Sequence, residues 1–305
     1  MNQNPQSQEL KKPVTKAVIA AAGFGTRFLP QTKAMPKEMM PLINKPIIQY
    51  VVEELVDAGI KDIIIIGSSN KRAIEDHFDL PSEDLLNNLR AGGEKKKPFI
   101  DEIEGIANLA NFMYIRQKGP YGNATPVYCA AHLLGDAPFI YTYADDFFVS
   151  NPGRTRQMVA TYEKYGGSVF ACKTVESDAE YDRYGIVAGE TVEDGVRKVE
   201  RVIEKPGKDA APSNMASVSG YLLTPDIFPY LEKAQQEHKD GEFMIQPIMQ
   251  AMMDDGLPYY AREIQNGRYY DTGDKLEYLK TVIDFGLSNE KLGPGLREYL
   301  RTKII

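Results

Sequence analysis

The stretch AAGFGTRFLPQTKAMPKEM, residues 21–39, follows a short apolar run at residues 17–20 that predicts a first β-strand. Gly23 and Gly25 stand two residues apart, and glycines after a strand allow backbone N–H groups to approach a phosphate chain closely. A dinucleotide-binding G-x-G-x-x-G motif is absent because Phe28 replaces its third glycine, and no G-x-x-x-x-G-K-[ST] motif occurs. The stretch therefore predicts a phosphate-binding loop of another kind, although Gly-x-Gly alone also fits an ordinary tight turn.

Cations and prolines follow the two glycines. Arg27, Lys33 and Lys37 place three positive charges on the stretch, and three prolines stand between residues 30 and 41. Prolines stiffen a segment and lower the entropy that it loses on ordering. The clustered cations and prolines favour a rigid, positively charged lid over an ordinary turn.

The composition is ordinary for a globular protein. The chain has 305 residues, enough to bury a large core, of which 43% are hydrophobic and 26% charged. No apolar run is long enough to span a bilayer, so we expect no membrane association. A formal net charge of −7 argues against a nucleic-acid-binding surface, which needs clustered basic residues. An anionic ligand must then be bound by local cations.

The cysteines and the N-terminus predict a cytoplasmic protein. Cys129 and Cys172 stand in apolar surroundings far apart in the sequence, which favours core thiols over a disulfide. The first twelve residues are polar and lack the apolar region of a signal peptide. We therefore predict a disordered tail over residues 1–13.

Apolar runs and turn residues predict alternating strands and helices in the first half of the chain. Such alternation is typical of βαβ units, so we predict an α/β fold with a Rossmann-like, mostly parallel (mixed) central sheet flanked by helices. Residues beyond Pro152 are richer in β-branched runs and predict a more β-rich second half. Thr125-Pro126 and Thr224-Pro225 predict threonine-capped helix starts, and the charged run 94–97 predicts a solvated loop.

Polar residues follow several predicted strands directly. Gly23, Gln117, Gly122 and Asp145 all stand just past the carboxyl end of a predicted strand, the edge at which open α/β sheets bind ligands. Asp145-Asp146 is also a pattern suited to a hard cation, because Mg²⁺ takes few carboxylates and completes its shell with water and phosphate oxygens. The pattern alone leaves open that these aspartates only form a turn.

The sequence also resembles a known family. Residues 21–39, together with PLINKPIIQYVVEELVDAGI at residues 41–60, closely resemble the N-terminal signature of sugar-phosphate nucleotidyltransferases, and of their bacterial uridylyltransferases in particular. Glu204-Lys205-Pro206, Tyr184-Gly185 and YYDTGD at residues 269–274 resemble later elements of the same family. The resemblance covers nearly the whole chain.

The resemblance implies a role for each matching residue. It implies that Arg27 and Lys37 hold phosphates and that Asp145 holds Mg²⁺, with Asp146 as a structural partner. Asp271 is left open between a second metal ligand and a helix cap. Expected nucleotide-binding residues are Ala21, Ala22, Gly23, Gly25, Thr26, Glu38, Gln117 and Gly122. Expected sugar-phosphate-binding residues are Tyr184, Gly185, Glu204 and Lys205.

The implied reaction is Mg²⁺-dependent transfer of a uridylyl group. A phosphate oxygen of glucose 1-phosphate would attack the α-phosphorus of UTP in line, giving UDP-glucose and pyrophosphate. The resemblance implies one catalytic domain with a nucleotide-binding half, 14–150, and a sugar-phosphate-binding half with C-terminal helices, 151–305. It also implies a homo-oligomer, either a dimer or a tetramer. Alternatives are a thymidylyl- or cytidylyltransferase and a non-catalytic UDP-sugar-binding regulatory protein; the missing third glycine disfavours an NAD dehydrogenase.

Two stretches depart from the family pattern. GNATP at residues 122–126 stands where close uridylyltransferases have G-L-G-H-A, and GEFMIQPIM at residues 241–249 stands where the family has G-E-I-Q-L-T-D-A-I. They fall on the expected base pocket and on one edge of the sugar-binding half. We nevertheless predict that UTP is preferred, because a backbone N–H such as that of Gly122 cannot flip to suit cytosine, whereas the Gln117 amide can.

Overall fold

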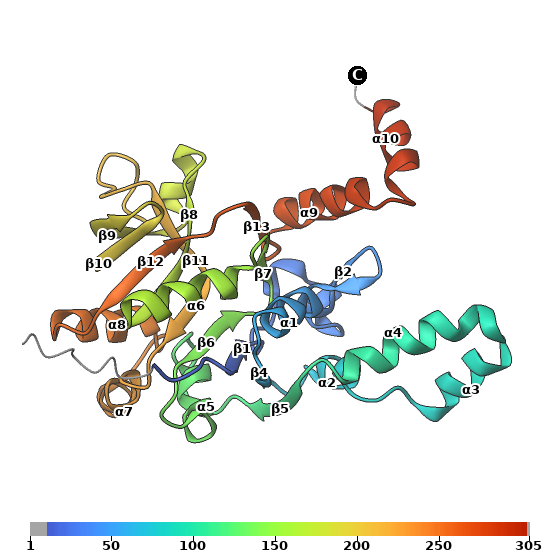
Figure 1. The fold of residues 1–305 in the computed structure, drawn as a ribbon, viewed down its shortest axis with the longest axis horizontal. Helices are drawn as coiled ribbons and strands as arrows, with labels where there is room; N and C mark the ends of the chain where they lie inside the picture. The colour runs from blue at the N-terminus through green and yellow to red at the C-terminus, as the bar shows by residue number, and fades with distance from the viewer. Residues whose placement is uncertain (1–10, 304–305) are drawn as a thin grey trace, which may run out of the picture.

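The computed structural model describes residues 11–303, which form a mixed α/β fold (Figure 1). Residues 1–10 of the predicted tail lie outside the described residues. No helix within the described part is long and apolar enough to cross a membrane.

A nine-stranded mixed sheet forms the centre of the molecule. Its first four strands pair in parallel, whereas antiparallel pairing prevails in the remainder, with β8 and β12 as a further parallel pair. The strands in spatial order are β5 (Asn111–Arg116), β4 (Asp62–Gly67), β1 (Lys16–Ala20), β6 (Phe139–Tyr143), β11 (Met215–Leu223), β8 (Ser168–Thr174), β12 (Tyr259–Glu263), β10 (Val196–Glu204) and β9 (Gly185–Glu193). The predicted α/β class and the β-rich second half are confirmed. The sheet is mixed rather than mostly parallel, because the strands of the second half pair largely antiparallel.

Each face of the sheet is covered by helices, which explains the apolar strands of the first half. Successive side chains of a strand point to opposite faces, so Ile19 belongs to one hydrophobic core and Val18 to the other. Helices α1 (Ile47–Asp57) and α6 (Arg154–Tyr165) pack into the first core. Helices α5 (Thr125–Leu134), α7 (Ile227–Glu237) and α8 (Ile245–Asp254) pack into the second.

The register of the parallel strands brings three strand ends level. Ala20, the last residue of β1, pairs with Ile66 of β4 on one side and with Tyr143 of β6 on the other. The segments that follow these strands therefore emerge at one edge of the sheet. This is the edge at which the sequence predicts a ligand site.

Smaller elements complete the fold. A hairpin of β2 (Pro41–Leu42) and β3 (Lys45–Pro46) precedes α1, and β7 (Asp146–Ser150) pairs antiparallel with β13 (Gly267–Asp271). Helix α2 (Arg72–Phe78) follows β4. Helices α9 (Lys275–Ser288) and α10 (Gly293–Arg301) end the described chain and extend away from the sheet (Figure 1).

The charged run 94–97 is not the solvated loop that the sequence predicts. It holds a short 3-10 helix and the start of α4 (Lys97–Ala107), which together with α3 (Glu83–Ala91) forms an arm projecting from the body (Figure 1). Lys97 forms an ion pair with Asp101 one turn later, and Pro98 occupies the first turn. Intrahelical pairing and a proline at the start thus favour helix over loop.

The two predicted threonine caps are also wrong. Ala124 stands at the N-cap of α5, and Thr125 Oγ1 donates instead to the Pro120 carbonyl at 2.6 Å. Helix α7 begins at Ile227, with Asp226 as its N-cap. The prolines were correct signals for a nearby helix start, but the hydrogen bonds that fix the first residue depend on the preceding loops.

Candidate active site

A pocket of about 430 Å³ lies at the carboxyl ends of β1, β5 and β6, and we call it the first pocket. Its walls come from the glycine-rich loop after β1, from the segments after β4 and β5, and from the start of α5. It is lined by Ala20, Ala22, Gly23, Phe24, Lys37, Glu38, Ser68, Gln117, Gly119, Tyr121, Gly122, Asn123, Pro126, Tyr143 and Asp145.

A second pocket of about 240 Å³ adjoins it and draws residues from both halves of the chain. It is lined by Arg27, Tyr143, Asp145, Asp146, Arg183, Tyr184, Gly185, Glu204, Ser217, Val218, Ser219, Tyr221, Gln246, Tyr269, Asp271 and Gly273. Tyr143 and Asp145 line both pockets. The end of β6 is therefore the place where ligands in the two pockets would meet.

Most predicted site residues line one of these pockets. Lys37, Asp145 and five predicted nucleotide-binding residues line the first, namely Ala22, Gly23, Glu38, Gln117 and Gly122. Arg27, Tyr184, Gly185, Glu204 and Asp271 line the second.

Four predicted residues line neither pocket. Ala21 is buried, and its N–H donates to the Ile66 carbonyl at 2.9 Å. Gly25, with a φ of +64°, is the N-cap of the 3-10 helix that starts at Thr26. Lys205 has a φ of +47° and an exposed side chain, and it stands beside Glu204 at the rim of the second pocket.

Lys37 and Asp145 form the central contact of the site. Lys37 Nζ lies 2.5 Å from Asp145 Oδ2, and both side chains are largely buried. Burial alone would lower the pKa of Lys37, but the carboxylates of Asp145 and Glu38 outweigh it and raise that pKa. Lys37 therefore stays cationic at the junction of the two pockets.

A buried ion pair stands behind Lys37. Lys71, at the N-cap of α2, contacts Glu38 at 2.7 Å, and the exposed fractions of their side chains are 3% and 1%. Burial raises the pKa of Glu38, although Lys71 acts against that rise. The pair joins the glycine-rich loop to the segment after β4, and no motif in the sequence indicated Lys71.

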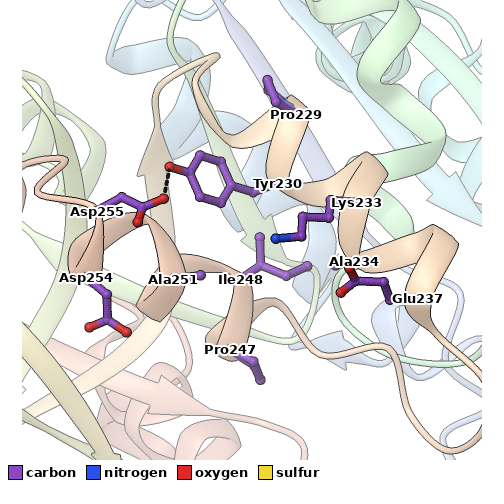
Figure 2. A pocket seen from close by; sticks show the side chains of 10 residues that line it. All are labelled: Pro229, Tyr230, Lys233, Ala234, Glu237, Pro247, Ile248, Ala251, Asp254 and Asp255. Atoms are coloured by element: carbon purple, nitrogen blue, oxygen red, sulfur yellow. Dashed lines mark hydrogen bonds between the residues drawn. The ribbon is translucent and has the colours of Figure 1, made fainter.

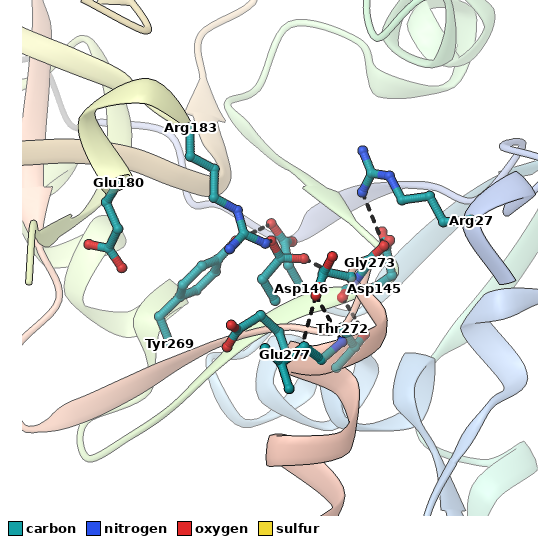
Figure 3. Close-up of polar contacts among 12 residues, drawn as sticks. Arg27, Asp145, Asp146, Glu180, Arg183, Tyr269, Thr272, Gly273 and Glu277 are labelled. Carbon is teal, nitrogen blue, oxygen red and sulfur yellow. Dashed lines mark hydrogen bonds and ion pairs between the residues drawn. The ribbon is translucent and has the colours of Figure 1, made fainter. Parts of the chain in front are cut away.

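Carboxylates from two elements gather beside the second pocket (Figure 3). Asp271 Oδ1 accepts the Gly273 N–H at 2.9 Å, and Asp271 Oδ2 pairs with Arg183 at 2.6 Å. A Cβ placed on Gly273 would lie 3.1 Å from Asp145 Oδ2 and 3.2 Å from Asp271 Oδ1. Because Gly273 has no side chain, the carboxylates of Asp145 and Asp271 can both lie close to its backbone.

Asp146 lies behind this pair. Its Oδ2 accepts a hydrogen bond from the Tyr269 hydroxyl at 2.9 Å, while no partner for the buried Oδ1 occurs within residues 11–303. Burial raises the pKa of Asp146 to about 7, and the charges of Asp145 and Asp271 act in the same direction. Three carboxylates are therefore close enough to repel one another.

The donor set fits a hard divalent cation. No group of three or more His, Cys, Asp or Glu in the described part of the chain is arranged to hold a metal ion by itself. Asp145 and Asp271 offer two carboxylates, and in the structure each is balanced by a cationic side chain, Lys37 or Arg183. Two carboxylates suit Mg²⁺, which completes its shell with water and phosphate oxygens. The helix-cap alternative for Asp271 is wrong, because Asp274 caps α9 by accepting from Leu276 and Glu277.

Sequence reasoning missed Arg183, Tyr143 and Gln246, which all line the second pocket. Arg183 directly precedes the Tyr184-Gly185 element, and Tyr143 stands two residues before Asp145, which the sequence places just past a strand end. The positions of both residues therefore carried a usable signal. Gln246 had none, because only tertiary packing brings α8 to this edge.

A larger groove of about 720 Å³ lies between α7 and α8 (Figure 2). It shares no lining residue with the two pockets. Its charged residues are one cation, Lys233, and three carboxylates, Glu237, Asp254 and Asp255. This balance disfavours phosphate binding there, so the smaller pockets remain the candidate site.

Comparison with known proteins shows the family to which the chain belongs. The family model described as nucleotidyl transferase matches residues 16–285. A UTP–glucose-1-phosphate uridylyltransferase of Bacillus subtilis (strain 168) is 42% identical over 281 residues, covering 92% of this chain and 94% of that protein. A protein of the same name from Staphylococcus haemolyticus (strain JCSC1435) is 40% identical, covering 95% of this chain and 98% of that protein.

Solved structures are similar over most of the chain. A UDP-glucose pyrophosphorylase complexed with UDP-glucose has 35% sequence identity and a TM-score of 0.76, covering 90% of this chain and 98% of that one. A UTP-bound UGPase from Acinetobacter baumannii has 32% identity and a TM-score of 0.81, covering 94% and 99% of the two chains.

Proposed function

We propose that this chain, which belongs to the nucleotidyl transferase family, makes UDP-glucose and pyrophosphate from UTP and glucose 1-phosphate. The observation that carries the proposal is the contact of Lys37 with Asp145 where the first and second pockets meet. A transferase of this kind must bring two anionic substrates together at one point. The names of the similar proteins supply the substrates.

The first pocket is assigned to UTP and the second to glucose 1-phosphate. The parallel strands β5, β4, β1 and β6 would then form a Rossmann-like nucleotide-binding half over 14–150. Residues 151–305 would form the sugar-phosphate-binding half of the same catalytic domain. Both halves contribute residues to the second pocket, because Arg27 and Asp145 of the first half line it.

The chemistry needs alignment and charge neutralisation rather than a general base. The attacking phosphate oxygen is already an anion, and the leaving pyrophosphate gains negative charge. Lys37 would hold the α-phosphate and Lys205 the sugar phosphate. Arg27 lines the second pocket and would hold the β- and γ-phosphates from that side, where the two pockets meet. Asp145 and Asp271 would hold Mg²⁺, which when bound supplies positive charge next to the phosphates.

Side chains with hydrogen-bonding groups would orient the sugar and the base. Glu204 would accept hydrogen bonds from sugar hydroxyls, and the sugar would lie against the backbone at Tyr184 and Gly185. Gln117 and the Gly122 backbone would read uracil. Since the Ala21 N–H is already bonded to Ile66, only the carbonyl of Ala21 remains for the base.

A pyrophosphate-release assay tests the proposal. The purified chain is incubated with Mg²⁺ and each pairing of UTP, dTTP or CTP with glucose 1-phosphate or another sugar 1-phosphate. UTP with glucose 1-phosphate should give the highest kcat/KM. A preference for another pairing would identify a sister enzyme instead, and binding of UDP-glucose without any pyrophosphate release would identify a regulatory protein.

The same resemblance leads us to propose a cytoplasmic homo-oligomer, either a dimer or a tetramer. Light scattering on the purified chain measures its molar mass directly. A monomer at micromolar concentration would contradict this part of the proposal.

A further inference from the structure

The two stretches that depart from the family pattern lie against each other. The Ala124 N–H donates to the Phe243 carbonyl at 2.9 Å, and the Phe243 N–H donates to the Tyr121 carbonyl at 2.6 Å. A Cβ on Gly122 would lie only 2.1 Å from the Phe243 oxygen, so the two backbones are in direct contact. The departures at 122–126 and 241–249 therefore form one local unit.

The side-chain amide of Asn123 links the two stretches, and both its oxygen and its nitrogen form hydrogen bonds. Its Oδ1 accepts the N–H of Ile245, the first residue of α8, at 2.8 Å. Its Nδ2 donates to Gln246 Oε1 at 3.1 Å and to the Tyr143 hydroxyl at 3.3 Å. A backbone N–H is always a donor, so Ile245 fixes which end of the Asn123 amide is oxygen.

The orientation of Asn123 fixes that of Gln246 in turn. Asn123 Nδ2 is a donor, so the end of the Gln246 amide facing it must be the oxygen. The nitrogen Nε2 is then the end that remains for the second pocket, which Gln246 lines. Gln246 can therefore offer a hydrogen-bond donor to an occupant of that pocket.

Glu204 lines the same pocket from β10 and presents only acceptors when ionised. A sugar hydroxyl both donates and accepts, so a hexose between these residues meets an acceptor on one element and a donor on another. At the corresponding positions the quoted family pattern has Leu for Asn123 and Thr for Gln246. Neither replacement offers an amide.

We propose that Gln246 is a specificity-determining residue, whose Nε2 donates to one ring hydroxyl of the hexose 1-phosphate. Asn123 is its positioning residue, because it holds the Gln246 amide in one orientation. The inference rests on the proposed function of the second pocket as the sugar-phosphate site. It adds a contact that selects among sugar 1-phosphates.

The test uses glucose 1-phosphate and its analogues deoxygenated at C2, C3, C4 or C6, each with UTP. In the wild type, each analogue that lacks a bound hydroxyl should lose kcat/KM, and the loss should be about tenfold, the effect of one hydrogen bond, for the analogue that lacks the hydroxyl bound by Gln246. In Gln246→Ala, glucose 1-phosphate should fall by about the same factor and the penalty for that analogue should disappear. The KM for UTP should stay within about twofold, since the contact is to the sugar.

A second variant tests the role of Asn123. Asn123→Asp keeps the acceptor for Ile245 but removes the donor, so the Gln246 amide should turn its nitrogen toward Asp and its oxygen toward the pocket. The penalty for the same analogue should then disappear although Gln246 is still present. Gln250→Ala is the matched control, because Gln250 stands one turn later on α8 and bonds to Glu200 and Asp254; its analogue profile should equal that of the wild type.

Different outcomes test the role of Gln246, the role of Asn123 and the proposed function. An unchanged analogue profile in a folded, active Gln246→Ala would overturn the assignment of Gln246, as would a change confined to the KM for UTP. A lost penalty in Gln246→Ala that persists in Asn123→Asp would overturn the role of Asn123. A wild-type chain that releases no pyrophosphate with any sugar 1-phosphate would overturn the proposed function and, with it, this inference.

Discussion

At the scale of single residues, the site depends on positive charge placed against carboxylates. Lys37 touches Asp145, and Arg183 touches Asp271, so the two pairs of opposite charge border the second pocket. These two ion pairs hold the four side chains in place when no substrate is bound. A polyanionic substrate and its cation would compete for the same four side chains.

Asp145→Asn should therefore lower kcat by about 10² or more, because a charge that acts on the reacting groups is lost. The fold should persist, since an amide has nearly the shape of a carboxylate. Steady-state rates over a range of Mg²⁺ concentrations measure the effect. Asp136→Asn is the control, because Asp136 pairs with Lys12 at an exposed site. Near-normal turnover of Asp145→Asn would remove Asp145 from the metal site.

Gly122 shows how a single backbone position shapes the pocket. Its φ is +135°, and any Cβ would overlap the Phe243 backbone. Gly119 in the same loop has a φ of +116°, but its nearest neighbour to a Cβ is a Thr125 methyl at 3.6 Å. At both positions a side chain would strain the backbone, and the two positions differ in the space available to a Cβ.

Gly119→Ala should lower the free energy of unfolding by about 1–3 kcal/mol through strain alone. Gly122→Ala should lower it by about 1–3 kcal/mol more, because the overlap forces the loop away from Phe243. Urea unfolding of both variants gives the difference. Equal losses would show that the loop moves freely and that Phe243 does not hold it.

At the scale of elements, a buried ion pair fixes α6 against α1. Arg154, at the start of α6, is 1% exposed and contacts Glu54 of α1 at 2.8 Å. Glu54 also accepts from the Thr155 N–H, and Arg154 donates to the backbone oxygen of Ser219 in β11. Glu54 thus links the start of α6 to α1 through its contacts with Arg154 and Thr155.

Glu54→Gln should lower the free energy of unfolding by about 3–5 kcal/mol, because it leaves the buried Arg154 charge unpaired. Asp57→Asn is the matched control on the same two helices. Asp57 pairs with Arg156 at an exposed site, with side chains 65% and 54% exposed, so its loss should cost at most about 1 kcal/mol. Similar losses in the two variants would contradict a special role for the buried pair.

The sequence predicted elements well where local signals are strong. The strand predicted at 17–20 falls within β1 (Lys16–Ala20), because a short apolar run that ends at turn residues has few alternatives. Helices α3 and α4 were missed because their charged, largely exposed residues also suit a loop. The capping residues of α5 and α7 were missed because distant loops compete for the same hydrogen bonds.

The site could be predicted in its parts but not in its connections. Lys37, Asp145 and Glu204 carried signals from motif and strand end, and all three line the pockets. The contact of Asn123 with Gln246 joins residues more than a hundred positions apart, and it exists only because α5 and α8 cover the same face of the sheet. No local pattern reports such packing.

At the scale of the whole molecule, the proposed function places one substrate in each half of the chain. The first pocket is built around parallel strands, and the second reaches across β11, β10 and β13. Gln117 belongs only to the first pocket, and Lys205 stands only beside the second. Substitutions at these two positions should therefore act on different substrates.

Lys205→Ala should raise the KM for glucose 1-phosphate and lower kcat, with little change in the KM for UTP, because an ammonium acts on the sugar phosphate as a point charge.

Gln117→Ala should act on UTP and leave the KM for glucose 1-phosphate nearly unchanged. It should raise the KM for UTP and reduce the preference for UTP over CTP, which a site of matched hydrogen-bonding groups can hold at up to about 10⁴. Discrimination against dTTP should be weaker, because thymine has the same hydrogen-bonding edge as uracil. Measuring kcat/KM for the three nucleotides and for glucose 1-phosphate in both variants gives the full comparison. A loss of UTP affinity alone in Lys205→Ala would place Lys205 on the nucleotide, and unchanged selectivity in Gln117→Ala would leave the backbone at Gly122 as the reader of the base.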